Sequence, residues 1–239
     1  MTTIQLTVAG IEVEIVRKDI RNLHLSVLPP LGQVRVAAPR LMPQEAIRAF
    51  AISKLTWIRR QRARMLAQER ESPHEYRDRE SHFVWGRRYL LKRVEQNAAP
   101  EVELQRGKLV LRVRPGTDTQ RCHQVLAAWY RTRVRDELPE LLAKWEAVID
   151  VRVRRVIVLR MKTRWGGCNP QSGIIRLNTE LARKPIECLE YILVHEMVHL
   201  LEPTHNPRFV ALMDRFLPTW RVLRERLNRL PVRREDWGY

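Results

Sequence analysis

Two histidines stand four residues apart in an apolar stretch near the C-terminal end of the chain. The stretch reads VHEMVHLL from residue 194 to residue 201. Residues four apart lie on one face of an α-helix, so His195 and His199 can reach the same metal ion. Glu196 points slightly round the helix, where it can take the proton of a water bound at the metal's open position. This HExxH spacing therefore constrains both the local fold and its chemistry.

The helix predicted around this motif is apolar on nearly every side. Leu189, Leu193, Met197 and Leu200 share the face opposite the two histidines by helical phase. Burying two imidazoles among such side chains costs stability unless something satisfies their nitrogens, and a metal ion would do so. The pattern therefore predicts a buried helix with a zinc ion on its polar side.

A third metal ligand is expected just beyond the helix. Pro203 disfavours helical geometry at Glu202, so the chain turns and can return His205 to the metal. Glu202 and Cys188 are alternative ligands by helical phase, but zinc sites favour imidazole. Glu202 is then either an acceptor for an imidazole N–H or a solvated residue. Three histidines leave a position for water, which is typical of a catalytic zinc site.

Composition and length exclude several classes of protein. Of the 239 residues, 44% are hydrophobic, which is enough for a substantial core. No segment has 18 uncharged apolar residues, and the N-terminus lacks the basic start and apolar run of a signal peptide. A cytoplasmic protein without a membrane partner is therefore expected. Three widely spaced cysteines argue against a disulfide framework or a cysteine zinc finger.

The chain is strongly basic, with 44 Lys and Arg against 27 Asp and Glu and a net charge of +17. Nucleic-acid binding is one interpretation of this charge. A solubilising, arginine-rich surface is the other. We favour the second, because no recognised nucleic-acid motif accompanies the charge and net charge alone indicates only non-specific association.

The N-terminal half is predicted to be rich in β-strands. Period-two and apolar runs followed by a tryptophan-bearing helix occur twice, which weakly suggests a duplication. Strands are expected at 4–16 with a turn at Gly10, and at 23–28, 33–37, 82–85, 89–91, 102–104 and 108–113, and helices at 44–68 and 118–148. Pro139 is expected to kink or split the second helix. We expect a β-rich region over 1–117 and a catalytic region over 118–239, together forming one continuous domain from about 10 to 230.

A second unusual stretch, MKTRWGGC at 161–168, precedes a strand candidate at 174–178. Adjacent glycines permit close backbone approach. A sheet edge beside a metal can bind an extended peptide by strand addition, whereas the bland interpretation is a hairpin that only supports the helix. The candidate substrate-binding residues are Arg164, Trp165, Gly166, Ile175 and Asn178. Candidate stabilisers of a developing oxyanion are Arg164, Tyr191 and Arg208.

Taken together, MKTRWGGC at 161–168 and HEMVH at 195–199, with His205 and Phe209, resemble the YgjP-like predicted zinc metallopeptidases, which are related to the SprT-like and WLM proteases. The resemblance covers most of the chain. It implies an α+β fold with a compact, zincin-like catalytic domain of the minigluzincin type. It also implies an HExxH active-site helix, Zn²⁺ held by His195, His199 and His205, and Glu196 as catalytic acid and base. Gly167 departs from the family, which usually has serine there.

The expected function is hydrolysis of peptide bonds in a protein or peptide by a metal-activated water, with Glu196 as general base. The alternative is a nucleic-acid-associated protein whose basic surface is primary. One version of that alternative combines both properties in a protease of DNA-bound proteins. The sequence names neither the natural substrate nor an oligomeric state.

Overall fold

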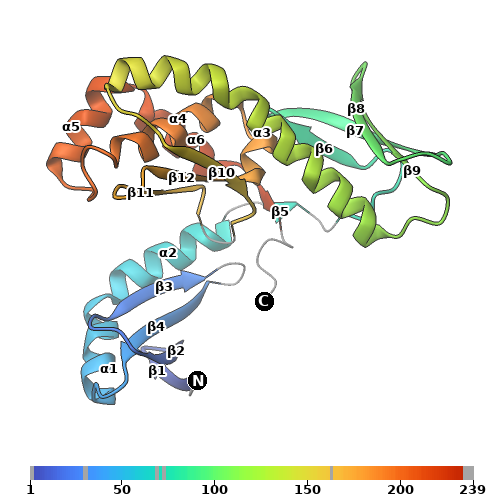
Figure 1. The fold of residues 1–239 in the computed structure, drawn as a ribbon. Helices are drawn as coiled ribbons and strands as arrows, with labels where there is room; N and C mark the ends of the chain where they lie inside the picture. The colour runs from blue at the N-terminus through green and yellow to red at the C-terminus, as the bar shows by residue number, and fades with distance from the viewer. Residues whose placement is uncertain (1–2, 29–31, 68–69, 72–73, 162–163, 234–239) are drawn as a thin grey trace. The chain divides into compact units, whose positions relative to one another are not determined.

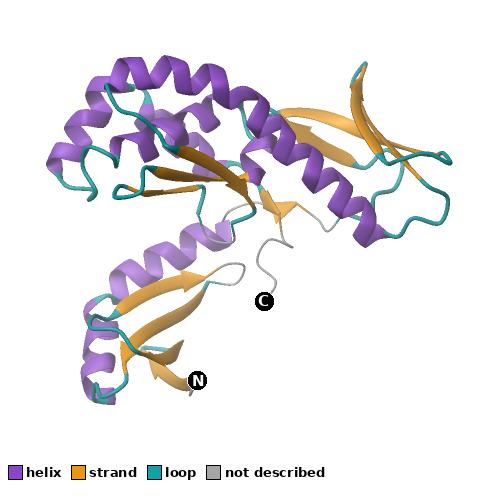
Figure 2. Cartoon of the chain, viewed as in Figure 1, coloured by secondary structure: helices purple, strands orange, loops and turns teal. Residues whose placement is uncertain are grey.

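The structure, a computed structural model, describes residues 3–28, 32–67, 70–71, 74–161 and 164–233. Residues 29–31 of the connection expected between two strands, and Lys162 and Thr163 of the glycine-rich motif, lie outside these ranges. The chain forms two compact units. Unit 1 comprises residues 1–72 and 231–239, and unit 2 comprises residues 73–230. Both contain helices and strands, as the sequence predicts (Figure 2).

Unit 1 is a four-stranded sheet with two helices. Its elements are β1 (Thr3–Val8), β2 (Ile11–Lys18), β3 (His24–Leu28), β4 (Gln33–Pro39), α1 (Gln44–Ser53) and α2 (Leu55–Ala67). The strand order is β1-β2-β4-β3, in which β2 and β4 run parallel and the outer pairs are antiparallel. Alternate residues such as Val13, Val34 and Val36 are buried against Ile47 of α1. The expected single helix is interrupted at Lys54. The short strands β5 (Arg70–Glu71) and β13 (Val232–Arg233) pair in parallel.

Unit 2 begins with a second four-stranded sheet and one long helix. The elements are β6 (Ser81–Val84), β7 (Arg87–Glu95), β8 (Glu101–Gln105), β9 (Lys108–Val113) and α3 (Thr119–Ile149). The order β6-β7-β9-β8 repeats that of unit 1, again with a parallel central pair. The first hairpin turn of each sheet has two residues with positive φ, Ala9 and Gly10 in unit 1 and Trp85 and Gly86 in unit 2. The two sheets thus share their strand order and the orientation of their central pair.

The remainder of unit 2 holds a smaller sheet and three helices. Its elements are β10 (Arg155–Leu159), β11 (Gly166–Asn169), β12 (Ile174–Asn178), the 3₁₀ helix η1 (Thr179–Arg183), α4 (Ile186–Val198), α5 (Pro207–Phe216) and α6 (Trp220–Arg229). The strand order β10-β12-β11 leaves β11 at one edge. Helix α4 packs against α3, α5, α6, β11 and β12. It is therefore enclosed, as its apolar sequence predicts.

One hydrophobic core joins both sheets of unit 2. It includes Leu109 and Leu111 of β9, Leu126 of α3 and Leu193 of α4. Helix α3 borders both sheets (Figure 1) and runs through Pro139 without a break. The boundary expected between residues 117 and 118 falls inside this unit, between β9 and α3. The sequence predicts four strands between residues 82 and 113, but it does not reveal that these strands share a core with α3.

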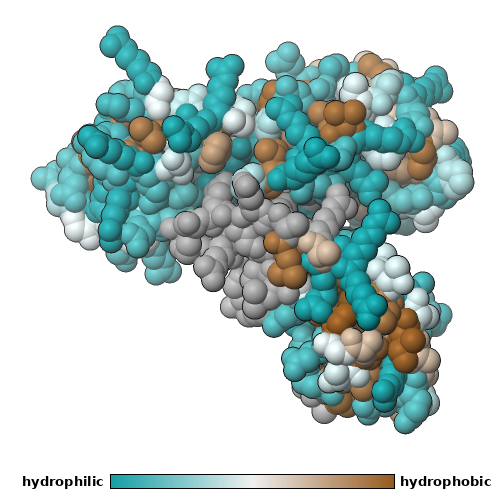
Figure 3. All heavy atoms as spheres, turned by 180° about the vertical axis from the view of Figure 1, so that it is seen from behind, coloured by the Kyte–Doolittle hydropathy of each residue, from teal (hydrophilic) through white to brown (hydrophobic). Residues whose placement is uncertain are grey.

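On the face drawn in Figure 3, hydrophilic side chains cover most of unit 2, whereas hydrophobic side chains gather in a larger group on unit 1. Among the helices of the described residues, none is long and apolar enough to cross a membrane.

The turn at Gly86 supports the start of α4, and substitution there tests this contact. A Cβ on Gly86, whose φ is +76°, would lie 2.8 Å from Cγ of Pro185. We expect Gly86→Ala to lower the free energy of unfolding by about 2–4 kcal/mol, from positive φ and overpacking together. Gly107 has a φ of +81° but nothing within 4 Å of its added Cβ, so Gly107→Ala should cost only about 1 kcal/mol. Equal losses for the two variants in urea titrations would contradict the contact.

Candidate metal centre

The C-terminal end of α4 carries the predicted metal ligands. His195 lies in the last turn of the helix, and His199 is its C-cap with helical backbone angles. The chain then turns, with the Leu201 and Glu202 N–H groups both donating to the Val198 carbonyl. This turn leads to His205 just before α5. The helix thus ends three residues before the limit expected from the apolar run, and the chain reverses ahead of Pro203.

The structure brings the three histidines together. One ring nitrogen from each of His195, His199 and His205 lies within 4.8 Å of the others. The Nε2 atoms of His195 and His205 are 3.0 Å apart. His199 Nδ1 lies 3.0 Å from the carbonyl oxygen of Glu202. Because a carbonyl only accepts, Nδ1 donates this hydrogen bond and Nε2 keeps a lone pair for a metal.

Phe209 packs against all three imidazoles. Its ring centroid lies 4.9 Å from that of His195, 4.6 Å from that of His199 and 4.7 Å from that of His205. Asn206 caps the N-terminus of α5 by accepting a hydrogen bond from the Phe209 N–H, which fixes the start of this helix. The buried ring therefore forms an apolar wall behind the three rings.

The environment favours the neutral form of two of the three imidazoles, those of His195 and His205. Burial lowers the pKa of His195 to about 3, and the neighbouring His199 and His205 add to the effect. Burial and His199 also lower the pKa of His205. His195 Nδ1 is buried without a hydrogen-bond partner among the described residues. Neutral imidazoles are the form that binds metals, so this donor set fits a divalent transition ion.

Glu196 lies beside the cluster in a confined space. Its side chain is only 6% exposed, and burial raises its pKa to about 8, although Arg164 acts in the opposite direction. A Cβ added to Gly166 of β11 would lie 2.6 Å from Glu196 Oε1. Any larger residue at this position would force Glu196, and Ile192 with a Cγ2 at 2.8 Å, to shift. A nearby divalent cation would favour the ionised form of this carboxylate.

The predicted substrate-binding residues fall into different environments. Arg164 is exposed, Trp165 is half-buried and Gly166 faces Glu196. Asn178, 5% exposed, donates from Nδ2 to the carbonyls of Met161 and Arg164 at 2.9 and 2.8 Å. Its amide nitrogen is therefore engaged with the backbone of these two residues.

Ile175 does not suit direct substrate contact. It is 0% exposed and lies in β12, the central strand of the small sheet. The outer strand beside α4 is β11, which contains the glycines. The order of strands, which is a non-local property, thus places residues 166–169 at the sheet edge and residues 174–178 in its centre.

The other candidates lie around the cluster. Tyr191 is buried 6.0 Å from the His195 ring, and burial raises its pKa to about 12. The Glu202 carboxylate accepts hydrogen bonds from Thr204, and exposed Arg208 lies 3.9 Å from it. Cys188 is fully buried and outside the cluster.

Arg224 of α6 was not singled out from the sequence. It lies close enough for its charge to lower the pKa values of His195 and His205. In the sequence it is one of many arginines near the C-terminus, and no spacing distinguishes it.

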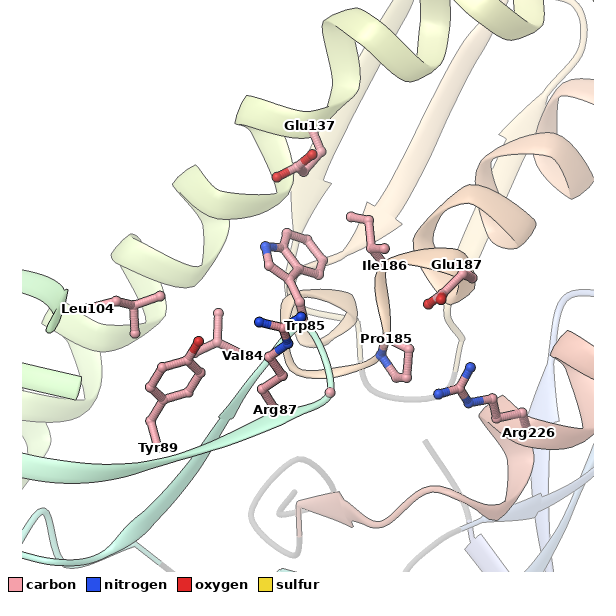
Figure 4. Close-up of a pocket in the computed structure, with 11 residues that line it drawn as sticks. Val84, Trp85, Arg87, Tyr89, Leu104, Glu137, Pro185, Ile186, Glu187 and Arg226 are labelled. Atoms are coloured by element: carbon pink, nitrogen blue, oxygen red, sulfur yellow. The ribbon is translucent and has the colours of Figure 1, made fainter. Parts of the chain in front are cut away.

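A pocket of about 580 Å³ lies at the opposite end of α4 (Figure 4). Trp85, Pro185, Ile186 and Arg226 are among the residues that line it. His195 is nine residues beyond Ile186, or about 14 Å along the helix axis. The pocket is therefore separate from the histidine cluster.

A comparison of the chain with models of protein families finds a match to one family. The family model described as YgjP-like, metallopeptidase domain, matches residues 21–230. No curated protein matches the chain significantly in sequence. Among solved structures, the metallopeptidase zymogen of Pyrococcus abyssi abylysin is 21% identical over 38% of this chain and 90% of that chain, with a TM-score of 0.35. That TM-score is too low to establish a shared fold.

The contact between Gly166 and Glu196 can be tested by adding one methyl group. We expect Gly166→Ala to displace the carboxylate and to lower peptide hydrolysis by about 100-fold, because small misplacements of a reacting group are costly. Gly167→Ala is the matched control, since its Cβ would meet nothing within 4 Å. Rates with a fluorogenic peptide mixture, measured on variants of equal zinc content, check this. Equal activity of the two variants would refute the assigned contact.

Proposed function

The chain belongs to the YgjP-like metallopeptidase family, and from this premise we propose that it is a zinc-dependent peptidase with Glu196 as its general base. His195, His199 and His205 are the proposed ligands. The observation that carries the proposal is the convergence of three imidazole nitrogens within 4.8 Å beside a buried carboxylate. We assign the catalytic region to the compact, zincin-like folds of the minigluzincin type, with α4 as the HExxH active-site helix.

Zinc is the ion that best suits these donors. Catalytic zinc sites commonly have three protein ligands and an open position, and imidazole is a preferred donor. The hydrogen bond from His199 Nδ1 to the Glu202 carbonyl would orient one ligand ring and raise its basicity. When bound, the ion supplies a Lewis acid that polarises a peptide carbonyl and lowers the pKa of water.

Glu196 is placed to move the protons of the reaction. Its carboxylate would accept a proton from the attacking water and then deliver it to the leaving amine. Burial keeps bulk water from competing for these transfers, and the approach of Gly166 restricts where the carboxylate can point. Phe209 would close the opposite side of the three imidazoles.

The small sheet suggests how a peptide would bind. Among the described strands, β11 pairs only with β12, so its outer edge has backbone groups to offer. An extended protein segment can add to such an edge through main-chain hydrogen bonds. Because Gly166 of β11 lies against Glu196, a peptide on this edge would run past the carboxylate. Trp165 and Arg164 would flank its path.

Replacing the proposed base separates metal binding from turnover. We expect Glu196→Gln to bind zinc as the parent does and to lose peptide hydrolysis by at least about 100-fold, since a general base contributes roughly 10²–10⁴-fold. Mass spectrometry of a digested peptide library and metal analysis of the same preparation measure both properties.

Glu187→Gln is the matched control for this experiment, because Glu187 is an exposed glutamate in the first turn of the same helix. It should keep both zinc and activity. Hydrolysis that persists at the parent rate in Glu196→Gln would rule out Glu196 as the base.

A further inference from the structure

We propose that His74, Glu80 and His82 form a second metal site, which takes a divalent transition ion such as Zn²⁺. One potential ligand atom from each residue lies within 4.8 Å of the others, the same criterion that the His195 cluster meets. The three residues lie in unit 2, on β6 and on the loop that precedes it. The site is independent of the proposed peptidase centre.

The donor atoms converge on one carboxylate oxygen. His74 Nδ1 contacts Glu80 Oε1, and His82 Nε2 lies 3.0 Å from the same oxygen. The two imidazole rings stack with their centroids 4.3 Å apart. His82 Nδ1 is buried with no hydrogen-bond partner among the described residues, and Nε2 has only the carboxylate oxygen that it shares with His74. A bound ion would give the 0% exposed His82 the partner that its burial requires.

The protonation states suit metal ligands. Burial alone would raise the pKa of Glu80, but the adjacent imidazoles of His82 and His74 lower it to about 2. Burial lowers the pKa of His82 to about 4. At neutral pH the carboxylate is therefore ionised and this imidazole is neutral. Two imidazoles and one carboxylate are a donor set that zinc and similar ions accept.

The charges that face the cluster permit a cation. Arg183 is near enough to lower the pKa of His82. Its guanidinium lies 3.1 Å from the carboxylate of Glu180 and 4.3 Å from the ring centroid of Tyr130. The positive charge of Arg183 is thus balanced by Glu180, and Glu80 is left to balance the ion.

The loop from His74 to Glu80 is shaped to close the site. Tyr76 and Arg79 have φ angles of +56° and +68°, which residues other than glycine rarely adopt. Glu80 Oε2 accepts a hydrogen bond from the N–H of Glu75 at 2.9 Å. One oxygen of Glu80 therefore holds the loop, while the other faces the two imidazoles. An ion here would link the loop to β6, so we infer a structural role for it.

Counting bound zinc tests the second site directly. After saturation with Zn²⁺ and removal of the excess, we expect two ions per chain in the parent protein. The variant His195→Ala/His199→Ala should keep one, because it retains the cluster at His74, Glu80 and His82. Glu80→Gln should also keep one, and the combination of all three substitutions should keep none. Glu75→Gln is the matched control, since it changes a neighbouring exposed glutamate outside the cluster, and it should keep two.

Two outcomes overturn the proposal: no zinc in His195→Ala/His199→Ala, or the same zinc content in Glu80→Gln as in the parent. If the cluster of His195, His199 and His205 binds no zinc, the result is different: both the parent and the His195→Ala/His199→Ala variant then hold one ion.

A second measurement avoids reliance on the folding of Glu80→Gln. The melting temperature of His195→Ala/His199→Ala should rise by several degrees with Zn²⁺, because an ion that binds only the folded state stabilises it. An unchanged melting temperature contradicts the second site.

Discussion

The burial of α4 is the constraint on which the rest of unit 2 depends. Helices α3, α5 and α6 and the small sheet surround it, and this packing restricts the orientations that its polar side chains can adopt. His195 and His199 turn toward His205 and Phe209, while Glu196 turns toward the backbone of Gly166. Burial lowers the pKa of His195 and makes the charge of an isolated Glu196 carboxylate costly. A divalent cation would bind the imidazole nitrogens and would also compensate the charge of the carboxylate.

The β6–β9 sheet supports this helix from its other end. The N–H groups of Trp85 and Gly86 donate to the carbonyls of Ala182 and Arg183, immediately before Pro185 and α4. The proposed second metal site lies on the same strand, β6, and would make this support more rigid. The sheet shares its strand order with that of unit 1.

The sequence predicts the parts of the site that depend on local periodicity. Spacing places His195 and His199 on one helix face, and Pro203 predicts the turn toward His205. The sequence could not predict that the backbone carbonyl of Glu202, and not its carboxylate, accepts a hydrogen bond from His199. Strand order is equally hidden, so the sequence does not show that β11 and not β12 forms the sheet edge. His74, Glu80 and His82 meet through an irregular loop with positive φ angles, which no periodic pattern indicates. The net charge of +17 does not locate a nucleic-acid site, because a sum of charges does not say where on the surface the charges lie.

The central claim is that three histidines of one buried helix and its following turn hold a zinc ion beside Glu196. A crystal structure of the zinc-loaded protein, with anomalous scattering measured at the zinc absorption edge, tests it most directly. The account predicts a peak bonded at about 2.0–2.1 Å to one nitrogen of each of His195, His199 and His205. A zinc-loaded crystal without a peak at these residues, or with His205 turned away from the ion, would contradict it.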